Sequence, residues 1–231
     1  MSSTYARRVA APALTAQLDQ LADLLGRMCV QAARTLRDAS AGLLDGRVRL
    51  AEKVVVDDGM DGLRAGVERV ATDALLLHAP VAGDLRAVVS AMHASDDLVR
   101  MGVLARHVAE AALRRQAGTV PAEVRPAFRQ MNQLGVNLAL KAAEVVRTRN
   151  VLLAVELDAD DETMDALHAS MFEVLMDRSW PHGVLAAVDV TLLARYYERF
   201  ADHAVLVAGE TVRAVTGRSP HEVAGFLESR P

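Results

Sequence analysis

The segment YYERFADHA, residues 196–204, decides the fold because a relative of it occurs earlier in the same chain. DDLVRMGVLARHV, residues 96–108, aligns with it at an offset of 99 residues. A second match joins DDGMDGL at residues 57–63 to DETMDAL at residues 161–167, with an offset of 104 residues. Two matches at nearly the same offset indicate an internal duplication with a period of about 100 residues.

Helical periodicity fills both copies of this duplication. Apolar residues recur in steps of three and four, which is the spacing of helices that bury one face. Aromatic residues make up only 3% of the chain, whereas a sheet protein is usually richer in them. The expected helices span residues 12–44, 47–78, 84–115, 127–148, 151–176 and 185–216, separated by the breaks DGR (45–47), APVAGD (79–84), QAGTVPAEVRP (116–126) and DRSWPHG (177–183).

Three helices, a junction and three more helices predict an all-α protein. We expect two tandem, pseudo-symmetric, antiparallel three-helix bundles, one over residues 1–116 and one over residues 117–217. We expect residues 218–231 to form a loosely ordered C-terminal tail.

Charge and cysteine content narrow the classes of function. The formal net charge of -4 argues against a general affinity for nucleic acid. Cys29 is the only cysteine, so no internal disulfide is possible, and its place in an apolar stripe predicts a core position. The first residues lack the long apolar run of a signal peptide, and no long uncharged apolar stretch occurs. We therefore expect a soluble, cytoplasmic protein.

Four carboxylates of the second copy are predicted to meet. Asp161 and Asp165 share one face of their helix, as do Glu198 and Asp202, because residues four apart lie one turn apart. Measured from the break at His182, the first pair lies 21 and 17 residues before it, and the second pair lies 16 and 20 after it. Antiparallel helices then place all four at one height. Clustered carboxylates of this kind suit hard multivalent cations, while solvated acidic faces without a cation are also common.

The first copy carries only half of this arrangement. Asp57 and Asp61 match the first acidic pair, but Val99 and Val103 stand where the second copy has Glu198 and Asp202. Any metal site at Asp57 and Asp61 is therefore expected to be weaker. The neighbouring acids at positions 96 and 97 are expected to point to another face.

The histidine and aromatic side chains near the acids are expected to have structural roles and not to take part in a reaction. His168 and His203 are expected at the surface or behind the metal ligands, and no Glu-x-x-His motif of a di-iron oxidase occurs. The aromatic residues at positions 196, 197 and 200 are expected to pack between helices, and Arg199 to neutralise the nearby acids. Neither a glycine-rich phosphate loop nor a catalytic triad is recognisable in the sequence.

Several motifs resemble the PhoU family of bacterial phosphate-uptake regulators. They are PVAGDLRAVVSA (80–91), DLVRMG (97–102), SWPHG (179–183), ERFADHAV (198–205) and the opening TYARR (4–8), and the second-half motifs look most like actinobacterial members. The resemblance implies two three-helix bundles, each with an E/D-x-x-x-D metal motif. Only the second motif, from Glu198 to Asp202, is intact here.

The resemblance also implies a non-catalytic regulatory role. We expect a negative regulator of phosphate uptake and phosphate-starvation signalling, linking a sensor histidine kinase to a subunit of the phosphate ABC transporter at the inner membrane face. A homodimer is expected, as is a divalent or trivalent ion (Fe, Mg, Zn or Ca), with the second repeat favoured. The alternatives are a metal-binding or storage bundle and a metal-dependent hydrolase.

Overall fold

The computed structural model describes residues 12–57, 59–114 and 120–228, and within these ranges the chain forms helices and no strands. The helices are α1 (Pro12–Asp45), α2 (Val48–Val56), α3 (Asp61–His78), α4 (Gly83–Arg114), α5 (Arg125–Thr148), α6 (Val151–Leu175), α7 (Gly183–Thr216) and α8 (Pro220–Glu228). The all-α class is confirmed, and the long helices end within a few residues of the expected positions. The opening residues 1–11 and the expected boundary near residue 116 lie outside the described ranges.

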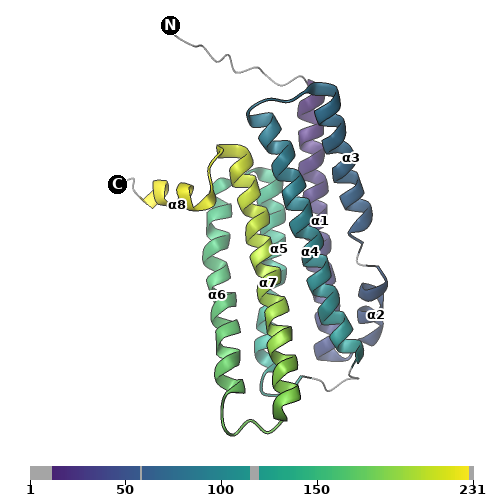
Figure 1. Ribbon diagram of the computed structural model, residues 1–231, viewed down its shortest axis with the longest axis vertical. Coiled ribbons are helices and arrows are strands. Elements are labelled where there is room, and N and C mark those ends of the chain that lie inside the picture. Colours follow the sequence, from purple (N-terminus) through teal and green to yellow (C-terminus); the bar gives the residue numbers. More distant parts are fainter. Residues whose placement is uncertain (1–11, 58, 115–119, 229–231) are drawn as a thin grey trace.

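The two copies of the duplication pack into one continuous core. In Figure 1, α1, α4, α5 and α7 lie side by side in the middle, α2 and α3 flank one side, and α6 flanks the other. Ala, Val, Leu and Met dominate the buried residues of these helices, and small side chains let the helix axes approach closely. The two repeats therefore share a central core formed by α1, α4, α5 and α7.

The contacts between the two repeats include a buried hydrogen bond and an aromatic pair as well as aliphatic packing. Ser40 of α1 and Tyr197 of α7 share a buried hydrogen bond of 2.7 Å between their hydroxyl oxygens. The rings of Tyr197 and of Phe128 on α5 pack in a tilted arrangement, with a centroid distance of 5.7 Å and an interplanar angle of 50°. Tyr197 and Phe200 are fully buried, and so is Cys29, which confirms the core positions expected for them.

Two expectations about secondary structure were wrong. The helix predicted over residues 47–78 is divided into α2 and α3, because Gly59 adopts a φ of 75° and its N–H donates to Asp57 Oδ1 at 2.7 Å. This local turn interrupts the helical hydrogen bonding. The tail expected to be loosely ordered contains α8, whose start is capped by hydrogen bonds of 2.7 and 2.9 Å from the backbone N–H and hydroxyl of Ser219 to Glu222 Oε2.

Candidate functional site

Side-chain hydrogen bonds cap the start of α6 and fix the turn that joins α6 to α7. Asn150 caps α6, because its Oδ1 accepts hydrogen bonds from the backbone N–H groups of Leu152 and Leu153 at 3.0 and 3.2 Å. In the turn that follows α6, Asp177 Oδ1 accepts from the backbone N–H of Ser179 at 2.7 Å. Trp180 Nε1 then donates to the carbonyl oxygen of Gly183 at 3.0 Å, where α7 begins.

This register brings the predicted acidic residues together. One oxygen atom from each of Asp165, Glu198 and Asp202 lies within 4.8 Å of the others. Glu198 is only 7% exposed, Asp202 is partly buried and Asp165 is exposed, so the group opens to solvent on the α6 side. We call Asp161, Asp165, Glu198 and Asp202 the acid cluster.

Asp161 belongs to the acid cluster by its electrostatics. Burial, followed by the negative charges of Asp202, Asp165 and Glu198, raises the pKa of the Asp161 carboxyl from 3.8 to about 7. Its Oδ1 atom is buried and has no hydrogen-bond partner among the described residues. A carboxylate without donors and beside like charges favours its protonated form unless a cation approaches.

The pKa values of the two acids on α7, Glu198 and Asp202, are also raised. Burial and the charge of Asp202 raise the pKa of Glu198, although Arg195 donates from Nη1 to Glu198 Oε1. Burial and the charge of Asp165 raise the pKa of Asp202, against the opposing effect of Arg195. Arg199 also lowers both values, so it partly neutralises the acids, as its position in the sequence predicts. The second oxygen of Glu198, Oε2, is buried without a hydrogen-bond partner in the described part of the chain.

The donor set fits a hard cation. Two buried carboxylate oxygens lack hydrogen-bond donors, and three acidic side chains converge within 4.8 Å, which together provide the anionic oxygen ligands that Mg²⁺, Ca²⁺ or Fe³⁺ prefer. His168 lies at the edge of this group, where burial and then the charge of Arg195 lower its pKa and favour the neutral ring.

The first repeat does not reproduce this arrangement in the described residues. Asp57 lies beyond the end of α2 and caps the turn at Gly59, while Asp61 starts α3, so the two do not share the face of one continuous helix. Both are exposed. On α4, Val103 is 38% exposed and Val99 is partly buried against the core.

One polar contact was missed by the sequence reasoning. His203 is buried, contrary to the surface position considered for it, and its Nδ1 lies 3.0 Å from Oδ1 of Asp97 on α4. Asp97 therefore points toward the second repeat. The sequence alone gives no signal for this pair, because the contact depends on how α4 and α7 pack.

The family of the chain follows from comparison with known proteins. The family model described as PhoU domain matches residues 25–112 and again residues 128–211, so the chain belongs to the PhoU family. The chain is 47% identical over 206 residues to the phosphate-specific transport system accessory protein PhoU homolog 2 of Mycobacterium tuberculosis, covering 88% of this chain and 97% of that protein.

Further relatives agree in sequence and in fold. PhoU homolog 1 of Mycobacterium leprae is 46% identical over 208 residues, which cover 89% of this chain and 94% of that protein. The crystal structure of PhoU from Pseudomonas aeruginosa superposes with a TM-score of 0.79 at 22% identity, covering 88% of this chain and 99% of that one. The latter likeness concerns the fold alone.

Proposed function

We propose that this protein is an accessory protein of a phosphate-specific transport system that restrains phosphate uptake and phosphate-starvation signalling. The observation that carries the proposal is the family match over both repeats, together with mycobacterial relatives at 46–47% identity that are named as accessory proteins of the phosphate-specific transport system. Its partners would be a subunit of the phosphate ABC transporter and a sensor histidine kinase.

The proposed place of action is the cytoplasmic face of the membrane. None of the helices in the described ranges combines the length and apolar composition that crossing a bilayer requires. Contact with the membrane would therefore be made through the transporter subunit and the kinase. In this scheme the protein performs no reaction of its own and acts by binding.

We further propose that the acid cluster holds a divalent or trivalent cation in the second repeat. Asp165, Glu198 and Asp202 would supply the ligand oxygens, and Asp161 would add a fourth carboxylate once it loses its proton. The cation would supply positive charge, which offsets the mutual repulsion of the four acids. The role of the chain is to hold these oxygens in place through the register of α6 and α7.

Deletion of the gene tests the regulatory role. Expression from a phosphate-starvation promoter should stay high in phosphate-rich medium when the gene is deleted, because a restraint on signalling is lost. Complementation with the intact gene should restore repression. Normal repression in the deletion strain, after deletion of any other PhoU-family gene, would show the proposal to be wrong.

Affinity capture tests the partners. The tagged protein, purified from membranes of cells grown with ample phosphate, should retain a transporter subunit and the kinase. Membranes from an untagged strain serve as the control. Capture of neither protein would contradict the proposed link.

A further inference from the structure

An apolar seam runs along the outer face of α4 in the first repeat. Six positions of this helix follow one another in steps of four and three residues: Leu85, Val89, Met92, Asp96, Val99 and Val103. We call these six positions the α4 seam. Four of its five apolar side chains are 38–41% exposed, and the remaining one, Val99, is partly buried. Steps that average 3.5 residues are the repeat by which helices pair along their length, and the seam is about 27 Å long at about 1.5 Å per residue.

A basic row follows one edge of the α4 seam. Arg86, His93 and Arg100 are exposed and lie seven residues apart, each directly after a seam residue. Within the described ranges neither arginine forms an ion pair, and His93 Nδ1 approaches Glu210 Oε2 of α7 only at 3.9 Å. Seven-residue spacing is also the spacing of the charged residues that flank the seam between two paired helices. The basic row therefore offers positive charge that the chain itself does not use.

The other edge of the α4 seam is formed by α3. The two helices lie side by side in Figure 1, and Arg64 Nη2 of α3 contacts Asp96 Oδ1 at 3.4 Å. Arg64 Nε also donates to Glu68 Oε1 at 3.0 Å, so the charges on this edge are paired within the chain. The acidic residue in the seam is thus neutralised, and a single polar residue in a seam helps to fix the register of a helix pair.

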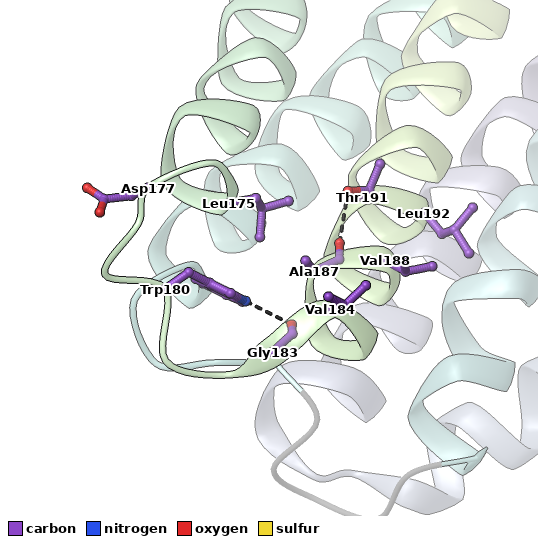
Figure 2. A pocket seen from close by; sticks show the side chains of 9 residues that line it. All are labelled: Leu175, Asp177, Trp180, Gly183, Val184, Ala187, Val188, Thr191 and Leu192. Carbon is purple, nitrogen blue, oxygen red and sulfur yellow. Dashed lines mark hydrogen bonds between the residues drawn. The ribbon is translucent and has the colours of Figure 1, made fainter.

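The second repeat does not carry such a seam. At the offset of 99 residues that relates the two copies, the aligned positions of α7 are Val184, Val188, Thr191, Arg195, Glu198 and Asp202. The first three line an open groove of about 500 Å³ at the turn between α6 and α7, as Figure 2 shows. The last two belong to the acid cluster. The valines that replace this acidic pair in the first repeat, Val99 and Val103, therefore extend an apolar surface by two helical turns.

We propose that the α4 seam is the docking site of an amphipathic helix of a partner protein, whose apolar residues recur in steps of three and four and whose acidic residues follow one edge. Its apolar side chains would pack between the exposed side chains of the seam, as in a coiled coil. Its Asp and Glu side chains would face Arg86, His93 and Arg100. The inference goes beyond the proposed function and does not depend on it.

Charge disfavours a membrane or a nucleic acid as the occupant. Asp96 lies within the seam, and Asp61 and Glu68 are exposed on α3 beside it, seven residues apart on one face. An anionic surface laid over the seam and α3 would meet these acids. A second copy of this chain laid antiparallel on the seam would bring two basic rows together, which like charges oppose.

A designed peptide tests the α4 seam in solution. The probe is a fluorescein-labelled helix of about 21 residues with Leu at its seam positions and Glu along both edges, so that repulsion keeps it from pairing with itself. The control peptide has Lys in place of each Glu. In fluorescence anisotropy with the full chain in EDTA, the Glu peptide should bind with a dissociation constant on the order of 10 μM, and the Lys peptide about 10-fold more weakly.

Matched variants locate the binding of the Glu peptide. Val89→Asp places a charge in the seam and should weaken binding by on the order of 30-fold. Val188→Asp should leave it unchanged, because Val188 aligns with Val89 and has a similar exposure, 49% against 40%, but lies in the groove of the second repeat. Arg100→Glu should weaken the Glu peptide and strengthen the Lys peptide by about 5-fold each, a reversal that damage to the fold does not produce.

Photocrosslinking in the source cells tests the natural occupant. Met92→benzoylphenylalanine should crosslink to a helical segment of another protein that has apolar residues in steps of three and four and acids along one edge. Leu192→benzoylphenylalanine, at an exposed position of α7, is the control and should not capture that segment.

Two sets of results would overturn the proposal. The first is failure of the Glu peptide to bind, equal binding of the two peptides, or equal effects of Val89→Asp and Val188→Asp. The second is crosslinking from Met92→benzoylphenylalanine to lipid, to a second copy of this chain, to a segment without an acidic edge, or to nothing.

Discussion

Asp161→Asn should stabilise the metal-free protein at alkaline pH. The Asp161 carboxyl has a pKa raised from 3.8 to about 7, mainly by burial and then by the charge of Asp202. The folded state therefore keeps a proton that the unfolded chain loses, and native stability falls as the pH rises from about 4 through about 7. The asparagine amide carries no charge at any of these pH values, so the variant should escape this loss.

The size of the effect follows from the same values. Each pKa unit corresponds to about 1.4 kcal/mol, so the difference between 3.8 and about 7 sets an upper value of about 4 kcal/mol. Because the carboxyl is only partly buried, solvent screening reduces the expected gain to about 2 kcal/mol.

Urea unfolding in EDTA, followed by circular dichroism, measures this gain. The variant and the unmodified protein should have nearly the same free energy of unfolding at about pH 4, and the variant should be more stable by about 2 kcal/mol at about pH 8. Asp73→Asn, which removes an exposed acid from α3, should show no such pH-dependent gain. An Asp161→Asn protein that is no more stable than the unmodified one at the higher pH would refute the reasoning about the acid cluster.

Two further variants test how the repeats are joined. Tyr197→Phe should cost about 1–2 kcal/mol in urea unfolding, because it leaves the buried Ser40 hydroxyl without its 2.7 Å partner. The double variant with Ser40→Ala should cost less than the two single changes added together, and strict additivity would argue against the contact. Gly135→Ala should destabilise by about 1–3 kcal/mol, because its methyl group would lie 2.8 Å from Leu36 and 3.4 Å from Phe200. An unchanged urea midpoint for Gly135→Ala would contradict this, because it would show that the neighbouring side chains accommodate the methyl group.

The sequence predicted the long helices well, because their periodicity and capping are local properties. The meeting of Asp165 with Glu198 and Asp202 was also predictable, since it needed only an antiparallel pair and a count of residues from the turn. Burial of the acids was not predictable in the same way. It depends on how α6 and α7 pack against each other, and burial of the Asp161 carboxyl is the main cause of its raised pKa.

The features that the sequence did not indicate have two physical causes, one local and one that depends on long-range packing. The division of α2 from α3 depends on one glycine that adopts a left-handed conformation within an otherwise periodic stretch. The pair of His203 with Asp97 and the bond of Ser40 with Tyr197 join residues more than 100 positions apart, so no local pattern indicates them. The packing of α1, α4, α5 and α7 into one core is likewise a property of the folded chain that no local pattern indicates.

Metal stoichiometry tests the central claim most directly. The protein should be dialysed against Mn²⁺, freed of excess ion and measured by plasma emission, beside two double variants. Glu198→Ala with Asp202→Ala should lose most of the bound metal, whereas Asp57→Ala with Asp61→Ala should retain it, because the converging carboxylates lie in the second repeat. Equal losses in the two double variants, or no metal in the unmodified protein, would contradict a metal site confined to the acid cluster.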